Sequence, residues 1–104
     1  MIEELDNDIV IFTLNKNFTE FPKEIFEYLK LKKKDIIIFF KNFSYKKIID
    51  KLIELNNFQN SINRVMIIVP AFKNELNLFN DLNLINSIEE GIDYIMFEKI
   101  QREL

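Results

Sequence analysis

The chain has 104 residues, of which 48% are hydrophobic and 30% charged, and its formal net charge is −3. This length suffices for one domain with a core, and the composition is that of a globular rather than a disordered protein. There is no His and no Cys, which excludes the usual zinc sites, thiol chemistry, disulfides and His-based triads, and the single glycine excludes a glycine-rich phosphate loop. We therefore expect a single domain over residues 1–104.

The first third of the chain predicts a β-hairpin followed by a helix. "MIEEL" and "IVIFTL" are two short extended segments, and the Asp-Asn-Asp sequence at 6–8 has the turn chemistry of a hairpin. In "NFTEFPKEIFEYLKLKKK", residues 17–34, Pro22 marks a helix start and apolar residues recur at helical spacing. Lysines close this helix, where cations complement the helix dipole.

The middle third predicts two buried strands around a second helix. "DIIIFF", residues 35–40, is a continuous apolar run typical of a strand covered on both faces. A helical stripe then begins at Ile48 and ends near Asn56-Asn57. "RVMIIVP", residues 64–70, is the second buried strand, which Pro70 stops.

The last third predicts a short helix, an edge strand and a long final helix. The short helix is "AFKNELNLFNDL", residues 71–82, and the strand is "NLIN". Ser87, followed by Glu90 three residues later, forms a capping box at the start of the final helix. We expect the apolar stripe of this helix to contain Ile88, Ile92, Ile95 or Met96, and Ile100.

This order of elements predicts an α/β fold. Apolar strands separated by amphipathic helices favour a single domain with a mixed, mostly parallel sheet of about five strands and about four helices. The first residues lack a signal peptide, and the longest unbroken apolar run has five residues, far short of a membrane span. We therefore expect a cytoplasmic protein.

The order and spacing of these segments resemble the STAS domain, the fold of anti-sigma-factor antagonists. "IVIFTLNKNF" resembles that family's second strand and the loop after it, "TEFPKEIFEYL" the start of its first helix, and "DIIIFFKNF" and "VMIIVP" its third and fourth strands. "LFNDLNLINSIEEGIDYI" is similar to the family's ending, in which a small residue, here Gly91, allows close packing of helix on sheet. The resemblance covers nearly the whole chain and implies a bacterial, non-enzymatic protein-interaction module.

The family's phosphorylation signature, Asp-Ser-Ser-Gly, is missing here. The corresponding junction, residues 42–47, reads Asn-Phe-Ser-Tyr-Lys-Lys, and neither the flanking strand nor the following helix aligns the family's serine with Ser44. The resemblance thus implies a protein partner, such as a regulatory kinase or a multi-subunit complex, without a switch driven by serine phosphorylation. A flavodoxin- or receiver-like domain that binds a small ligand or phosphate at the ends of its strands shows the same alternation and stays open as the alternative.

Positive charge is concentrated in the middle of the sequence. Residues 30–51 carry eight basic and two acidic side chains, a net +6. The lysines of 30–34 precede the strand at 35–40 and those of 41–51 follow it, so roughly 17 Å of strand separates the two clusters. With only two arginines and a net negative charge, we do not expect nucleic-acid binding.

The second lysine cluster is the more informative one. Lys46 and Lys47 fall in the first turn of the second helix, where the helix dipole disfavours cations. They could receive a partner's carboxylate or phosphate, or they could simply point into water.

Ser44 has two interpretations, as the N-cap of the second helix and as a phosphorylation site, and capping alone accounts for it. Phe43 and Tyr45 flank it. We expect at least one of the two to face solvent as an interface anchor, although Phe43 could instead plug the end of the core.

The predicted function is therefore protein binding, with the chain either a monomer or a homodimer. The acidic residues fall on polar helix faces or in turns, so we predict no enzyme activity, no cofactor and no metal site. The predicted partner-binding residues are Asn42, Phe43, Ser44, Tyr45, Lys46 and Lys47, together with Asn15, Lys16 and Asn17 in the neighbouring loop.

Overall fold

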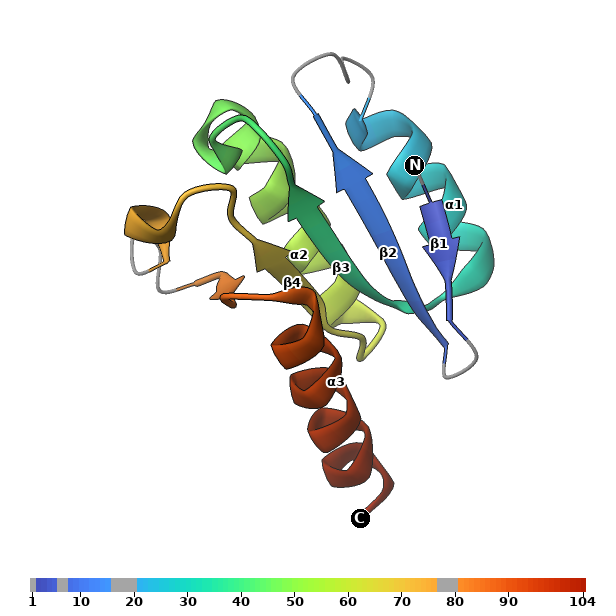
Figure 1. Cartoon of the computed structure of the whole chain (residues 1–104). Coiled ribbons are helices and arrows are strands. Elements are labelled where there is room, and N and C mark those ends of the chain that lie inside the picture. The colour runs from blue at the N-terminus through green and yellow to red at the C-terminus, as the bar shows by residue number, and fades with distance from the viewer. Residues whose placement is uncertain (1, 6–7, 16–20, 77–80) are drawn as a thin grey trace.

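The computed structural model describes residues 2–5, 8–15, 21–76 and 81–104. In this part of the chain a five-stranded sheet carries α-helices on both faces (Figure 1). The strands are β1 (Ile2–Glu4), β2 (Ile9–Leu14), β3 (Asp35–Phe40), β4 (Met66–Val69) and β5 (Asn83–Leu84). The helices are α1 (Phe21–Lys32), α2 (Ile49–Ser61) and α3 (Ile88–Glu103), with short 3₁₀ turns at Tyr45–Ile48 and Lys73–Glu75.

The strands lie side by side in the order of the sequence. β1 pairs antiparallel with β2, while the pairs β2–β3, β3–β4 and β4–β5 are parallel. The predictions of an α/β fold, a mixed sheet of five strands and an N-terminal hairpin are confirmed, although residues 6 and 7 of the hairpin turn lie outside the described residues.

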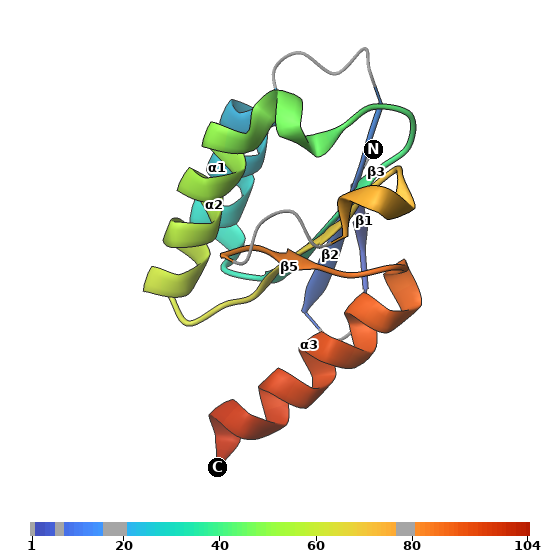
Figure 2. The ribbon, with the colours of Figure 1, turned by 90° about the vertical axis from the view of Figure 1, so that its left-hand side faces the viewer.

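Each central strand is apolar at nearly every position because both of its faces are covered. On one face Phe12 and Ile38 pack with Leu52 and other residues of α1 and α2; on the other, Ile37 and Ile67 pack with Ile95 of α3. Figure 2 shows α1 and α2 together on one side of the sheet. This two-sided burial explains why the strands read as continuous hydrophobic runs.

The single glycine allows α3 to approach the sheet closely. A Cβ atom at Gly91 would lie 3.2 Å from Cγ2 of Ile67 and 3.3 Å from Cδ1 of Ile37. These are tighter than most Cβ contacts, so a side chain here would push α3 away from two fully buried isoleucines. The expectation of close helix–sheet packing at this position is confirmed.

The predicted number of helices is wrong for the described residues, which contain three α-helices rather than four. The segment 71–82, expected to be a short helix, forms one 3₁₀ turn at Lys73–Glu75, and residues 77–80 lie outside the described part. No side chain caps this turn at Phe72. Glu75, which an amphipathic helix would turn to solvent, is buried instead.

The second helix extends further than the sequence indicates. It was expected to end near Asn56-Asn57, but α2 continues to Ser61. The side-chain amides of Asn56 and Gln59 are buried and donate hydrogen bonds to the backbone carbonyls of Asp81, at 3.1 Å, and Lys34, at 2.8 Å. Asn56, which in the sequence resembles the end of the helix, therefore lies on the buried face of α2.

The apolar stripe of α3 also differs from the prediction. Of the two alternatives Ile95 and Met96, Ile95 is buried against the sheet and Met96 is exposed. Ile100 is also exposed, so its assignment to the stripe is wrong. Among the described helices none is both long and apolar enough to cross a membrane.

Candidate partner-binding surface

All four parallel strands, β2 to β5, end at the same edge of the sheet, which we call the carboxyl edge; the opposite one is the amino edge (Figure 1). Residues 41–48, the β3–α2 turn, lie at the carboxyl edge. So do Asn15, directly after β2, and the 3₁₀ turn Lys73–Glu75 after β4. In open α/β sheets this edge is where loops present binding groups.

Ser44 shapes the β3–α2 turn. The backbone N–H of Lys41 donates to the carbonyl of Leu14 at 3.0 Å and so extends the β2–β3 pairing by one residue. Ser44 then has extended backbone angles, and its Oγ accepts a hydrogen bond from the N–H of Lys46 at 3.2 Å. The prediction that Ser44 is an N-cap is confirmed, although the turn that it caps is a 3₁₀ turn leading into α2.

The turn is tied to Glu75, 31 residues further along the chain. The Ser44 hydroxyl donates to Oε2 of Glu75, and the Tyr45 hydroxyl donates to its backbone carbonyl at 3.1 Å. Glu75 is buried, and among the described residues its other carboxylate oxygen, Oε1, has no hydrogen-bond partner. Sequence reasoning missed this contact because it placed acidic residues at the surface.

The two aromatic residues beside Ser44 belong to the core. Tyr45 is fully buried and Phe43 half-buried, with ring centroids 6.3 Å and 5.1 Å from that of Phe40. Burial raises the pKa of Tyr45, and the nearby charge of Glu75 raises it further. The expectation of a solvent-facing aromatic anchor is therefore wrong for Tyr45, and Phe43 packs as a plug at the end of the core.

The polar residues of the turn remain at the surface. Lys41, Asn42, Lys46 and Lys47 are exposed, and none of these three lysines forms an ion pair within the part of the chain that the structure describes. Asn15 is exposed at the end of β2, whereas Lys16 and Asn17 lie outside the described residues. The turn thus brings three cations together on one anchored segment.

The lysine cluster at the amino edge is different. Lys34 lies 3.8 Å from a carboxylate oxygen of Glu4 and 3.8 Å from one of Asp8. The predicted separation of the two clusters by β3 is confirmed. Acidic neighbours balance the charge of Lys34, whereas the lysines of the β3–α2 turn form no ion pair among the described residues.

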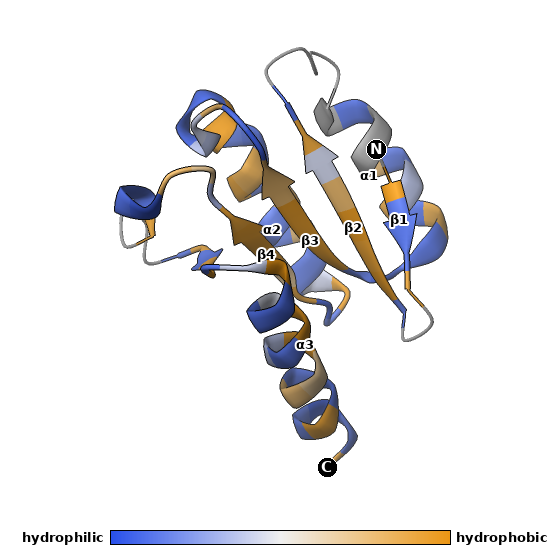
Figure 3. Ribbon diagram, in the orientation of Figure 1, coloured by the Kyte–Doolittle hydropathy of each residue, from blue (hydrophilic) through white to orange (hydrophobic). Residues whose placement is uncertain are grey.

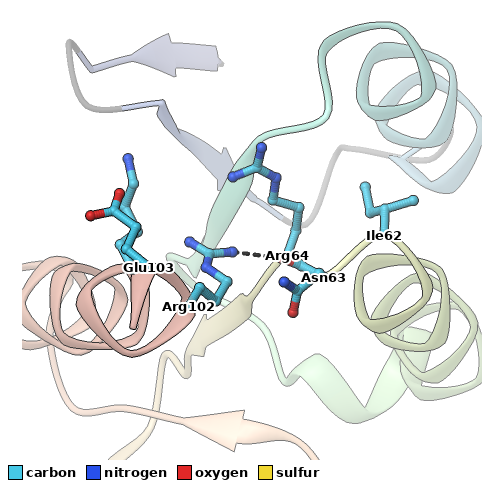
Figure 4. Close-up of a pocket in the computed structure, with 6 residues that line it drawn as sticks. Ile62, Asn63, Arg64, Arg102 and Glu103 are labelled. Carbon is cyan, nitrogen blue, oxygen red and sulfur yellow. Dashed lines mark hydrogen bonds between the residues drawn. The ribbon is translucent and has the colours of Figure 1, made fainter.

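A second buried carboxylate, that of Asp35, organises the amino edge. Asp35 is fully buried and accepts hydrogen bonds from both terminal nitrogens of Arg102, at 3.1 and 2.9 Å, and from the backbone N–H of Val65 at 2.8 Å. Arg64 lies 4.0 Å away, and Arg102 also donates to the carbonyl of Asn63 at 2.6 Å (Figure 4). The hydrogen bonds that Arg102 donates to Asp35 raise the pKa of its guanidinium. Both arginines of the chain therefore serve one carboxylate.

The surroundings of Asp35 form a hollow of about 230 Å³. Two guanidinium groups line this hollow. That of Arg102 is hydrogen-bonded to Asp35, and that of Arg64 lies 4.0 Å from it. We therefore regard this region as a structural junction between α3, β3 and the α2–β4 connection. The prediction that acidic residues lie on polar surfaces is wrong for Asp35 and Glu75. The available signal was an aspartate that begins an apolar strand in a chain with only two arginines.

Another hollow, of about 430 Å³, lies at the carboxyl edge on the α3 side. Phe39, Val69 and Ile88 give it an apolar lining, and the Ser87 hydroxyl is occupied as the N-cap of α3, accepting from the N–H of Glu90 at 3.1 Å. Glu89 and Glu90 place negative charge in the first turn. This chemistry suits an apolar group better than a phosphate. No cluster of three or more potential metal ligands occurs among the described residues.

Comparison of the chain with protein-family models, with curated proteins and with solved structures finds no match.

Proposed function

We propose that the chain is a non-enzymatic protein-interaction module that binds an acidic segment of a protein partner through the β3–α2 turn. The observation that carries the proposal is the group of exposed lysines, Lys41, Lys46 and Lys47, without ion pairs among the described residues. Such charges at the carboxyl edge are available to a partner's carboxylates, which they would attract and orient.

The buried contacts beneath the turn support this proposal. The hydrogen bonds from Ser44 and Tyr45 to Glu75, with the packing of Phe43 on Phe40, hold the backbone in one conformation. A turn that is already ordered loses little conformational freedom on binding. The backbone that carries the lysines is therefore anchored before a partner binds.

The contact between Ser44 and Glu75 also bears on regulation. A phosphate on Ser44 would stand against a buried carboxylate and would lose the hydrogen bond that the hydroxyl donates. We therefore propose that the surface is constitutive. The resemblance to STAS domains supports a partner such as a regulatory kinase or a subunit of a larger complex, in a bacterial cytoplasm.

The alternative, a phosphate- or small-ligand-binding domain, receives less support. The hollow at the carboxyl edge has an apolar lining and two glutamates in the adjoining helix turn. Negative charge there would repel a phosphate. A thermal-shift screen with nucleotides and inorganic phosphate addresses this alternative directly.

The proposal is tested by capture of the partner. The immobilised chain is used for affinity purification from the cells that express it, and partners are identified by mass spectrometry. The double variant Lys46→Glu/Lys47→Glu should bind the identified partner at least about tenfold more weakly, because each substitution replaces an attraction by a repulsion. Circular dichroism should show an unchanged fold, since both side chains are exposed.

The matched control is Lys30→Glu/Lys33→Glu, the same change of charge on exposed lysines near the amino edge. It should leave capture unchanged. Equal losses in the two double variants would reduce the effect to net charge, and unchanged capture by Lys46→Glu/Lys47→Glu would overturn the assignment of the site.

A further inference from the structure

Helix α3 carries large apolar residues on two opposite faces. Gly91 and Ile95 face the sheet. At 100° per residue, Phe97 and Ile100 lie on the side away from Ile95, Met96 lies at the border of that side, and Leu104 follows the last helical residue. Met96, Phe97, Ile100 and Leu104 are exposed by 38, 59, 57 and 94%. A surface helix normally turns polar residues to this side, so these positions need an explanation.

We call these four residues the α3 outer patch. They leave on the order of 500 Å² of apolar surface uncovered, which is as much as the largest apolar patch of a typical monomer. Apolar positions are visible along the end of α3 in Figure 3, and this end reaches past the amino edge of the sheet. The patch therefore lies away from the β3–α2 turn.

We propose that the α3 outer patch binds the same patch of a second copy of this chain, with the two α3 helices antiparallel. A symmetric pair would bury on the order of 1,000 Å², which reaches the size of a specific but weak interface. The pairing is self-complementary, with Ile100 near the two-fold axis and Met96 of each copy beside Leu104 of the other.

Charge selects the antiparallel arrangement. The outward side of the first two turns of α3 bears Glu89, Glu90 and Asp93, all exposed. Parallel helices would place these six carboxylates against one another, whereas antiparallel helices send them to opposite ends of the pair. Only the apolar turns then overlap.

This arrangement goes beyond the proposed function and is compatible with it. Because the outer patch is opposite the face that holds the sheet, the two domains lie on opposite sides of the helix pair. Their carboxyl edges point away from each other and both β3–α2 turns stay accessible. The dimer would present two identical lysine surfaces, so a partner with two acidic segments would bind by avidity.

The mass of the full chain in solution tests the proposal. Sedimentation velocity from about 1 µM to about 1 mM should show a rise from one chain of 12.6 kDa toward twice that mass, as expected for a weak interface. The variant Phe97→Asp/Ile100→Asp should stay at the mass of one chain, with unchanged circular dichroism because both side chains are exposed. Phe72→Asp removes an exposed apolar side chain elsewhere and should dimerise normally.

The absence of cysteine allows a test of the orientation. Ile100→Cys should form an intermolecular disulfide on mild oxidation, because the two Ile100 positions face each other at the axis. Leu31→Cys, which is 82% exposed on another helix, should remain mostly monomeric. The Lys46→Glu/Lys47→Glu variant should dimerise like the native chain, so failure of the partner surface and failure of the dimer are distinguishable.

Three outcomes would overturn the proposal. The native chain could stay at the mass of one chain over the whole concentration range, which would leave the patch to a different occupant. Dimers could persist in Phe97→Asp/Ile100→Asp, or Leu31→Cys could cross-link as readily as Ile100→Cys.

Discussion

The two ends of the sheet each contain a buried carboxylate, and the two carboxylates differ in their hydrogen-bond and charge partners. Asp35 at the amino edge receives two hydrogen bonds from Arg102, one from the backbone of Val65, and the nearby charge of Arg64. The carboxylate of Glu75 at the carboxyl edge receives one hydrogen bond, from the hydroxyl of Ser44, and its Oε1 has no partner among the described residues. No cation contacts it within that part of the chain.

The difference distinguishes charges that stabilise the fold from charges that remain at the surface. At the amino edge Arg102 joins α3 to β3 and Lys34 pairs with Glu4 and Asp8, although Lys30 and Lys33 are exposed nearby. At the carboxyl edge the lysines point to solvent although a buried carboxylate lies beneath the same turn. Under the proposed function, the lysines of the β3–α2 turn are the charges that bind the partner.

The largest expected effect comes from removing the cation at the amino edge. Arg102→Ala leaves Asp35 fully buried with only a more distant arginine, and it should lower the free energy of unfolding by about 3 kcal/mol, as expected when one partner of a buried ion pair is lost. Urea unfolding followed by circular dichroism measures this loss.

Two further variants make this measurement specific. Lys51→Ala removes an exposed ion pair with Glu54, and it should cost less than about 1 kcal/mol. Arg102→Lys keeps the charge but loses the two-pronged contact, so its cost should be intermediate. If Arg102→Ala costs no more than Lys51→Ala, the amino edge is not a stabilising junction and the contrast between the two ends fails.

A smaller effect distinguishes two serines that cap helical segments. Ser87 only caps α3, so Ser87→Ala should cost about 1 kcal/mol. Ser44 also supplies the hydrogen bond to the buried Glu75, so Ser44→Ala should cost about 2 kcal/mol, because a buried acceptor loses its donor.

A double-mutant cycle isolates the contact itself. In a Glu75→Gln background the buried group is neutral, and the cost of Ser44→Ala should fall toward that of Ser87→Ala. Equal costs of the two serine substitutions in the native background would mean that Ser44 acts as a cap alone. The β3–α2 turn would then not be anchored through the side chain of Glu75.

The parts of this fold that sequence can predict are those in which local pattern and burial coincide. β2, β3 and β4 are apolar at every position or nearly so because helices cover both faces, and Ser87 precedes Glu90 at capping distance because the first turn of α3 needs an acceptor. The separation of the two lysine clusters follows from the length of one strand.

The sequence predictions fail where contacts with residues far away along the chain determine the local structure. The spacing of Phe72 and Leu76 is helical, but the burial of Glu75 depends on a serine 31 residues earlier, which no local pattern reveals. Tyr45 reads as a loop aromatic until the core beneath it is known. Met96 and Ile100 fit an apolar stripe, yet the rotation of α3 is set by Gly91 against the sheet and by Arg102 on Asp35.

The smallest expected effect appears only at alkaline pH. Each of the three tyrosines has a pKa raised above 10, mainly by burial, and that of Tyr28, whose hydroxyl also donates to Glu4, reaches about 12. A raised pKa means that folding favours the neutral phenol. This contribution to stability is complete below pH 10 and is lost as the pH rises toward about 12. The free energy of unfolding should therefore fall over this interval.

Absorbance at 295 nm follows the ionisation, since the chain has no tryptophan. The chain unfolded in urea should be half-ionised near pH 10, as expected for free tyrosine, and the native chain clearly later. Glu4→Gln should lower the pKa of Tyr28 only in part, because burial is the larger cause, and Glu75→Gln should affect Tyr45 alone. A native chain half-ionised at pH 10 would show that water reaches all three phenols. Tyr45 would then not be a buried anchor of the β3–α2 turn that carries the lysines.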